Sequence, residues 1–512
     1  MRMRTFFLSS VLLGTALLAG FALAQGIGGS EPAVEKFQPV LTVDNQGPGP
    51  SRLQLLVQVR GALDAYKLET ISRYGTIDLV IERYRLVSVI PAGPRGERAL
   101  RSLPFVESVE TDLPRWLTDT ASWDRDILDV VDVEESGIVG TPDPREVAET
   151  GAGVHVAVID SGLIKRWREF LPASQVRTDL ARAFMGGGAV VGLNNVSDPT
   201  NLWERDTNSH GTAVASHIIG FKIGARVVDG VAPGASVIPL KVFPNGEAFT
   251  FASRISAAIA YTTQLKDAGA IGPTVINISI GGGPSNFERL AIQDAIDHGI
   301  VVVASAGNGG EGGMSWPGAF AEVISAGATG WVEQFVPAPP ASSGAFWWTR
   351  DVGNDPDGSG TSEELQSFVT TFSGRAIPQL GIDRGVGPQE LDVLAPGLWT
   401  VAPCLLPGAS RFGDVSNASF CFWSGTSFSS PLTAGVAALL LEKNGGLTQA
   451  DVESILKASA LSMAGNDGRA VPVPVGTTNP TTWDTSCGPS ALACDPVGAG
   501  LLQADAALAA VP

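Results

Sequence analysis

The feature that most constrains the fold is a series of apolar runs, rich in Val and Ile, that alternates with helical stretches between residues 154 and 308. Continuous runs of this kind are typical of parallel strands that helices cover on both faces. The runs read VHVAVID, ASVIPLKVF, TVINISI and IVVVASAGN, and the helical stretches read GTAVASHIIGF, RISAAIAYTTQL and ERLAIQDAIDHG. The sequence therefore predicts an α/β fold: a doubly wound, mostly parallel sheet with helices on both faces.

A second, shorter pattern occupies residues 53–112. A strand, a helix, one or two strands, a second helix and a last strand follow one another there, which is the order of a split βαβ unit. We therefore predict a small α+β, ferredoxin-like domain. Residues 25–52, rich in Gly, Pro and Gln, and residues 113–149, acidic and interrupted by proline, are predicted to be linkers, so that the large domain spans 150–512.

Residues 1–24 have the organisation of a secretory signal peptide. Arg2 and Arg4 precede a short apolar run, and Ala22-Leu23-Ala24 has the small-x-small form of a cleavage site. A membrane anchor is the alternative, but the run is short and no later run approaches the roughly 18 apolar residues that a spanning helix needs. We expect a secreted or periplasmic protein without a stable membrane anchor.

The formal net charge of −18 argues against a nucleic-acid partner, because phosphate binding requires a basic face. The chain has no CxxC pair and no HExxH, so a zinc site is not expected. Residues 331–389 break the strand and helix pattern and are interpreted as a surface insertion. Four of its residues are candidate calcium ligands, although they lack EF-hand spacing: Asp351, Asn354, Asp355 and Asp357. We expect no cofactor in the chemistry and leave a structural calcium ion open.

The chain has four cysteines, an even number that predicts disulfides in an exported protein. They are Cys404, Cys421, Cys487 and Cys494. Three pairings are possible, and proximity in the sequence favours Cys404 with Cys421 and Cys487 with Cys494.

Four motifs place polar side chains at the ends of predicted strands and helices. HVAVIDSG puts Asp160 at the carboxyl edge of a strand, where catalytic groups gather in such sheets. His210 begins a helix in NSHGT, and Asn308 follows a strand in ASAGN. SGTSFSSP places Ser427 in a glycine turn before a long apolar helix. Singly each has a structural explanation, since an aspartate there often caps a helix and a lone histidine often belongs to the core.

Taken together and in this order, the motifs resemble the signatures of the subtilisin-like serine proteases, the subtilases. They are Asp-Ser-Gly at 160–162, Ser-His-Gly-Thr at 209–212, Ala-Gly-Asn at 306–308 and Gly-Thr-Ser-x-Ser-x-Pro at 425–431. The resemblance implies a serine endopeptidase in which Ser427 is the nucleophile, His210 the general base and acid, and Asp160 the anion that orients the imidazole. It also implies that the Asn308 amide and the Ser427 backbone N–H form the oxyanion hole.

The resemblance further implies a site for polypeptide substrates. Ser279, Ile280 and Gly281 resemble the edge segment that pairs with an extended peptide, PNGEAFTF at 244–251 resembles the opposite wall, and Gly307 is a further candidate for substrate binding. A buried strand and turn is the alternative explanation of the first segment. The small N-terminal domain resembles the family's inhibitory propeptide, with self-cleavage expected between about 110 and 145.

The predicted function is thus that of an exported serine endopeptidase, made as a zymogen and acting through an acyl-enzyme. The alternative is a catalytically silent subtilase fold that serves as a binding module, but such forms usually lose a triad member or the oxyanion asparagine, and all four residues are present. An α/β-hydrolase esterase would need a GxSxG elbow and the order Ser, acid, His. GTSFS lacks the second glycine, and the order here is acid, His, Ser.

Overall fold

The computed structural model describes residues 54–112, 114–116, 124–128, 130, 145–185, 189–191, 201–223, 226–331, 367–405, 418–463 and 493–512. The expected signal peptide, the linker at 25–52 and the candidate calcium ligands at 351–357 lie outside these ranges. None of the helices within them is long and apolar enough to cross a membrane.

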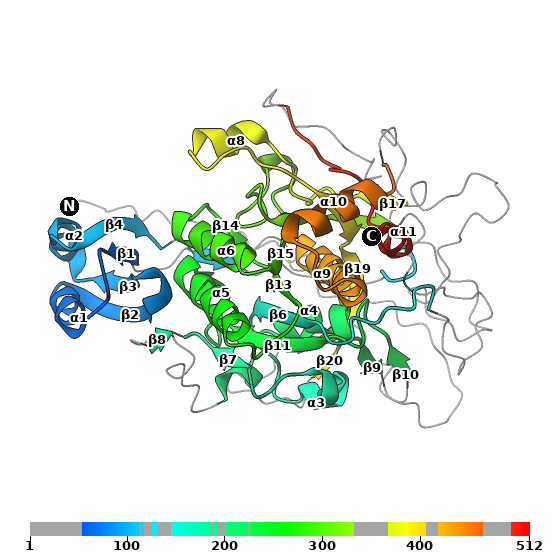
Figure 1. Cartoon of the computed structure of the whole chain (residues 1–512), viewed down its shortest axis with the longest axis horizontal. Coiled ribbons are helices and arrows are strands. Elements are labelled where there is room, and N and C mark those ends of the chain that lie inside the picture. Colours follow the sequence, from blue (N-terminus) through cyan, green and yellow to red (C-terminus); the bar gives the residue numbers. More distant parts are fainter. Residues whose placement is uncertain are drawn as a thin grey trace, which may run out of the picture. The chain divides into compact units, whose positions relative to one another are not determined.

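The large domain is built on the predicted α/β sheet (Figure 1). Its strands lie in the order β17-β16-β15-β13-β6-β11-β7, with β18 also paired to β16. All neighbours are parallel except β17, which runs antiparallel to β16. The strands are β6 (His155–Asp160), β7 (Arg182–Ala183), β11 (Ser236–Lys241), β13 (Thr274–Ile278), β15 (Ile300–Ser305), β16 (Ile324–Trp331), β17 (Ser367–Val369) and β18 (Val393–Pro396). The central strands are buried along almost their whole length, as their Val and Ile content predicts.

Helices cover this sheet in pairs. Helix α5 packs beside α6, as Figure 1 shows, and α4 packs beside α9, which lies against β13, β15 and β16. The helices are α3 (Trp167–Phe170), α4 (His210–Ile219), α5 (Ala252–Asp267), α6 (Asn286–Asp297), α8 (Pro378–Asp383), α9 (Thr426–Lys443), α10 (Gln449–Ser459) and α11 (Ala504–Ala509). Helix α9 is buried from Thr426 to Leu441, which explains why its sequence is apolar on every side.

Further short elements of the large domain are the strands β9 (Phe221–Ile223) and β10 (Arg226–Val228) and the 3-10 turns η3 (Ala173–Gln175), η4 (Leu202–Glu204) and η5 (Gly310–Gly312). The 3-10 turn η2 (Glu82–Tyr84) belongs to the N-terminal domain. Part of the stretch interpreted as a surface insertion belongs to the body of the domain. Strand β17 is buried at the edge of the main sheet, and Gln389 bonds to the backbone of Met314 and Ile377.

The N-terminal domain has the predicted ferredoxin-like arrangement, with the strand order β4-β1-β3-β2. Its elements are β1 (Leu55–Val59), α1 (Ala65–Ser72), β2 (Gly75–Ile81), β3 (Leu86–Pro91), α2 (Gly93–Ser102) and β4 (Val106–Thr111). A fifth strand from the large domain, β8 (Ala189–Val191), pairs in parallel with β2 and was not predicted. The sheet has two apolar faces: Leu55 and Val57 belong to the small core, and Leu56 belongs to the core of the large domain. The residues of β1 therefore alternate between the two cores.

A disulfide joins the two strands of a hairpin, β19 (Leu398–Leu405) and β20 (Ala418–Ser424). Cys404 and Cys421 form it, with their Cα atoms 5.8 Å apart, and this confirms the predicted pairing. Cys494 is also disulfide-bonded, and its expected partner Cys487 lies outside the described residues.

Replacing Cys404 and Cys421 together by alanine should lower the free energy of unfolding by about 3 kcal/mol, because the crosslink closes a loop with a sequence separation of 17 residues. The measurement is urea unfolding under non-reducing conditions with a serine-directed inhibitor present, which prevents self-digestion. An unchanged midpoint would contradict the expectation.

Candidate active site

Asp160 and His210 meet at the carboxyl edge of the sheet. Asp160 is the last residue of β6, which lies between β13 and β11, and His210 is the first residue of α4. The Nδ1 atom of His210 lies 2.9 Å from Oδ1 and 3.0 Å from Oδ2 of Asp160, and both side chains are fully buried. Because Nδ1 faces a carboxylate, it carries the ring proton and leaves Nε2 as the basic nitrogen.

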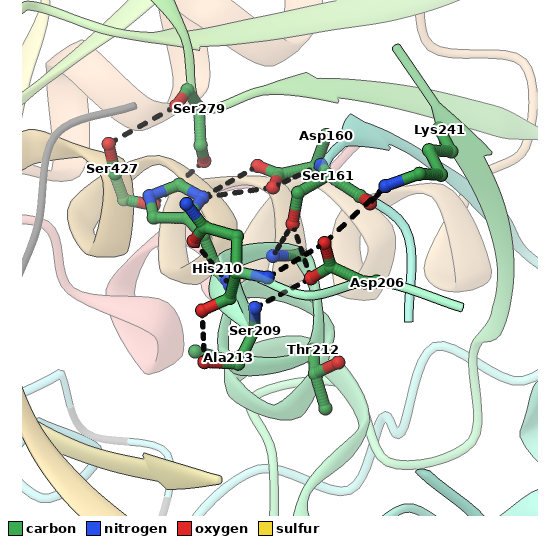
Figure 2. A network of polar contacts seen from close by, with 12 residues as sticks. Asp160, Ser161, Asp206, Ser209, His210, Thr212, Ala213, Lys241, Ser279 and Ser427 are labelled. Atoms are coloured by element: carbon green, nitrogen blue, oxygen red, sulfur yellow. Dashed lines mark hydrogen bonds and ion pairs between the residues drawn. The ribbon is translucent and has the colours of Figure 1, made fainter. Parts of the chain in front are cut away.

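Ser427 is the second residue of α9 and follows the turn at Gly425. Gly425 has a φ of 150°, a conformation that favours glycine, and this turn carries the chain from β20 into the helix. Figure 2 shows the imidazole of His210 between Asp160 and Ser427. The Oγ atom of Ser427 lies 3.2 Å from the backbone oxygen of Ser279. The three side chains predicted as a triad are thus brought together from β6, α4 and α9.

Pro431 explains a second bond between Ser279 and Ser427. Pro431 is the sixth residue of α9, inside the helix, and it has no N–H to bond the carbonyl oxygen of Ser427 four residues earlier. The hydroxyl of Ser279 donates to that oxygen instead, at 2.7 Å. Proline therefore leaves one backbone oxygen of the helix without its helical donor, and the bond from Ser279 to this oxygen ties the backbone of Ser427 to the segment after β13.

The other hydroxyls of the SGTSFSSP motif have structural partners. Ser429 donates to the backbone oxygen of Ala395 at 3.0 Å, and Ser430 donates to Oδ1 of Asn277 at 2.7 Å. The hydroxyl of Ser424 lies 3.4 Å from the backbone nitrogen of Trp399. Ser427 is therefore the member of the motif that lies beside His210.

Asn308 lies next to the start of α9. Its Oδ1 atom accepts from the backbone N–H of Thr426 at 3.0 Å and from the Thr426 hydroxyl at 2.9 Å. The backbone N–H of Gly307 donates to the Thr426 hydroxyl at 3.0 Å, and the backbone oxygen of Gly307 accepts from the backbone N–H of Gly374. These bonds fix the orientation of the Asn308 amide, and Gly307 serves to hold Asn308 and Thr426 together.

The chain itself lies in the site predicted for an extended peptide. Strand β5 (Pro114–Trp116) pairs antiparallel with β12 (Phe249–Phe251) on one side and with β14 (Gly281–Gly282) on the other. Trp116 is opposite both Phe249 and Gly281. Ser279 and Ile280 are buried, and Gly281 provides the paired edge. The two segments that the sequence identified as walls are thus the two edges that hold β5.

Aromatic rings surround the imidazole. The ring centroids of Phe428 and Trp423 lie 5.3 Å and 6.0 Å from that of His210.

His217, farther along α4, bonds to the backbone oxygen of Ala213 and lies 3.2 Å from Asp124. Burial would raise the pKa of Asp124, but Arg125 and His217 outweigh burial and lower it. His217 thus belongs to a buried polar contact apart from the triad.

A cluster of carboxylates that could hold a metal ion lies elsewhere in the described part of the chain. It consists of Glu390, Asp392 and Glu453. The ammonium of Lys457 lies 2.6 Å from Glu390, 2.9 Å from Asp392 and 3.3 Å from Glu453. Burial would lower the pKa of Lys457, but its bonds to Glu390 and Asp392 raise it. The lysine charge thus occupies the place that a cation would take.

Comparison with known proteins agrees with this geometry. A family model described as the subtilase family matches residues 151–488. The chain belongs to the subtilase family. It is therefore a member of a family of serine endopeptidases, as the four motifs implied.

Relatives extend the match over both domains of this subtilase. The chain is 26% identical over 468 residues to alkaline elastase YaB of Bacillus sp. (strain YaB), and this alignment covers 89% of this chain and 94% of the elastase. It is 28% identical over 315 residues to subtilisin Savinase of Lederbergia lenta, and this alignment covers 61% of this chain and 86% of Savinase. Fervidolysin from Fervidobacterium pennivorans, described as a keratinolytic enzyme related to subtilisin, superposes with a TM-score of 0.59 at 19% identity. That match covers 94% of this chain and 66% of fervidolysin, and it shows the fold alone.

Sequence reasoning did not find three polar residues beside the triad of this subtilase: Ser161, Asp206 and Lys241 (Figure 2). Two signals were available. Asp206 stands four residues before His210, and Lys241 lies inside the predicted buried strand ASVIPLKVF. A charge in such a strand requires a partner, because burying an isolated charge is costly.

Gly211 is the position at which the meeting of β6 and α4 can be tested. A Cβ atom there would lie 2.4 Å from the backbone oxygen of Gly162 and 3.0 Å from Oδ1 of Asp160. Gly211→Ala should therefore displace His210 and lower kcat by roughly 10²-fold, since about 1 Å of misplacement has that effect. Peptide hydrolysis and circular dichroism measure activity and fold. Gly312→Ala is the matched control, because nothing lies within 4 Å of its added Cβ. Equal activity of the two variants would contradict the expectation.

Proposed function

We propose that this subtilase is an exported endopeptidase, made as a zymogen, that hydrolyses peptide bonds through Asp160, His210 and Ser427. The observation that carries the proposal is the buried contact of Asp160 with His210, together with the place of Ser427 beside the imidazole at the start of α9 (Figure 2). A serine hydroxyl is a weak nucleophile at neutral pH, so it needs an imidazole to take its proton. The arrangement supplies that base and a carboxylate to hold its tautomer.

The reaction follows from the atoms present. Nε2 of His210 takes the proton of the Ser427 hydroxyl while Oγ attacks the peptide carbonyl. The resulting imidazolium is stabilised by Asp160 and then gives its proton to the leaving amine. Water then attacks the acyl-enzyme, while Nε2 of His210 takes a proton from the water and afterwards returns it to Oγ of Ser427. Asp160 remains ionised throughout, since its part is to orient and stabilise the ring.

The negative oxygen of the tetrahedral intermediate requires donors that are fixed beforehand. The backbone N–H of Ser427 is at the second position of α9, where N–H groups have no partner within the helix. The Nδ2 group of Asn308 is the second donor. The two hydrogen bonds that Thr426 donates both go to Oδ1 of Asn308, so Nδ2 is the donating end of the amide.

The zymogen proposal rests on the place of β5. This strand follows the N-terminal domain and lies between the two edges that we assign to substrate. A peptide substrate would add a strand in the same way, because main-chain bonds give affinity without a fixed sequence. The N-terminal domain therefore excludes substrate as long as it stays attached and docked.

Charged contacts hold the N-terminal domain on helices α5 and α6. Asp112 accepts from the backbone N–H of Ser253 at 3.0 Å, near the N-terminus of α5. Glu110 accepts from the hydroxyl of Ser285, the N-cap of α6, and burial raises its pKa. Anions are favourable at helix N-termini. At the other ends of the helices, Arg83 pairs with Asp267 and Asp294.

Export is proposed from residues 1–24, and the physiological substrates are proposed as polypeptides in general. The names of the relatives describe those proteins alone. Release of active enzyme requires cleavage of the chain after β5.

The register of β5 predicts where this cleavage falls. Trp116 pairs with Gly281, and Ser279, two residues before Gly281, bonds to Ser427. Counting two residues forward from Trp116 in the antiparallel register gives position 118. We therefore expect the mature enzyme to begin at Asp119, within about one residue.

Ser427→Ala should retain its N-terminal domain and fail to digest casein. Mass spectrometry of the N-termini measures this, and cleavage by the variant itself would contradict the proposal.

Asn308→Ala should lower kcat by about 10²–10³-fold and leave KM nearly unchanged, because an oxyanion donor acts in the transition state. The measurement is steady-state hydrolysis of a peptide substrate by the mature enzyme. Asn286→Ala, an exposed asparagine at the start of α6, is the control and should have wild-type constants. An equal effect on kcat and substrate affinity would instead indicate a structural role for Asn308.

A further inference from the structure

A buried ion pair lies beside Asp160 and His210 (Figure 2). The Nζ atom of Lys241 lies 3.4 Å from Oδ1 of Asp206, and each side chain is 1% exposed. Lys241 ends β11 and is the register partner of Asp160 on the neighbouring strand β6. The two charged residues thus start from adjacent strands at the same edge of the sheet.

Ser161 connects this ion pair to the triad. Its hydroxyl donates to Oδ2 of Asp206 at 2.8 Å and accepts from the backbone N–H of Gly211 at 2.9 Å. Its backbone N–H donates to Oδ1 of Asp160 at 2.6 Å, and Lys241 donates to its backbone oxygen. One residue therefore contacts both carboxylates, the lysine and the first turn of α4.

Asp206 also fixes the loop before His210. It accepts from the backbone N–H groups of Asn208 at 3.1 Å and Ser209 at 2.6 Å. Ser209 has a φ of 76°, an unfavourable value for a residue other than glycine, asparagine or aspartate. The carboxylate thus stabilises the strained residue that directs the chain into α4.

The charge of the pair requires an explanation of its own. A buried ion pair often stabilises a fold no more than apolar residues of the same size, so a need for stability alone does not account for it. With a neutral His210, the two carboxylates exceed Lys241 by one negative charge. When the imidazole takes the serine proton, the four groups become neutral together. Replacing either member of the pair by a neutral residue would remove this balance.

We propose that Asp206 and Lys241 are positioning residues of the protease: through Ser161 and Ser209 they hold Asp160 and His210 in place, and their opposite charges set the electrostatic balance in which His210 acts as base. This inference rests on the proposed function, since it concerns the same triad. It assigns to a lysine and an aspartate outside the triad an effect on the rate and on its pH dependence.

Other groups face His210 and α4, and the proposed variants leave them in place. Asp160 faces the ring from β6, Ser427 and Phe428 from α9, and Trp423 from β20. Farther along α4, His217 lies against Asp124, which pairs with Arg125. On η4, beside β11, Glu204 pairs with Arg168 near the surface. Their effects on His210 are therefore common to the wild type and the variants.

The test uses two substitutions of opposite electrostatic sign in the mature enzyme. Asp206→Asn leaves Lys241 unbalanced, which disfavours the imidazolium and should move the acid limb of the kcat/KM profile to lower pH. Lys241→Met leaves an extra negative charge and should move it to higher pH. At an effective dielectric constant near 20 each shift should be about one pH unit. In both variants kcat should fall at least tenfold while KM changes little.

The combined variant Asp206→Asn/Lys241→Met separates charge from position. Its net charge around His210 equals that of the wild type, because one negative and one positive charge are removed together, so the acid limb should return to the wild-type pH while kcat stays reduced. Lys241→Arg, which retains the charge, should also keep the wild-type midpoint. If a single variant does not fold, the combined variant and Lys241→Arg carry the test. A midpoint displaced in either of them by a unit, or a wild-type kcat in the combined variant, overturns the proposal.

A direct titration supplies a readout that does not depend on turnover. In full-length chains carrying Ser427→Ala, the NMR signals of the His210 ring report its protonation in each background. The inference is supported if the midpoint of the His210 titration shifts in opposite directions in Asp206→Asn and Lys241→Met. It is overturned if both midpoints shift in the same direction or if neither shifts. Failure of the proposed function is a different result, because wild-type enzyme would then show no hydrolysis that depends on Ser427.

Discussion

The contact between Asp160 and His210 is the interaction on which the site depends. It requires the end of a central strand and the start of a helix to meet with no intervening side chain, and Gly211 provides that space beside the backbone of Gly162. Both groups are fully buried, so water does not weaken their interaction. The buried Asp206–Lys241 pair lies next to this contact and shares Ser161 with it.

Ser427 and the edge that we propose for substrate are coupled through Ser279. The hydroxyl of Ser279 donates to the backbone oxygen of Ser427, which Pro431 cannot bond because it has no N–H. The backbone oxygen of Ser279 lies 3.2 Å from the Ser427 hydroxyl. Two residues later the same segment pairs with β5. Only Ile280 separates Gly281, which pairs with the bound strand, from Ser279, which contacts Ser427. A peptide paired with this edge would therefore be held close to Ser427 in a fixed orientation.

The sequence predicted the parts of the site that depend on local pattern. Buried runs of Val and Ile gave the strands that end at Asp160 and precede Asn308, and the glycine turn before an apolar helix gave Ser427. The strands β8 and β17 were missed, because segments of three residues carry too little pattern and pair only with distant edges. The partners of Asp206 were missed for a related reason. An aspartate near a loop has many local uses, and only its burial beside Lys241 distinguishes it.

The amino-acid sequence by itself determined the α/β class, the ferredoxin-like N-terminal domain, the subtilase motifs and the pairing of Cys404 with Cys421. These follow from periodicity, short motifs and proximity along the chain. The tertiary structure alone decided that β5 lies between β12 and β14, that Ser279 compensates for Pro431, and that the buried pair of Asp206 and Lys241 lies beside Asp160 and His210. Each of these joins segments far apart in the chain, and such contacts depend on how strands and helices pack in three dimensions rather than on neighbouring residues.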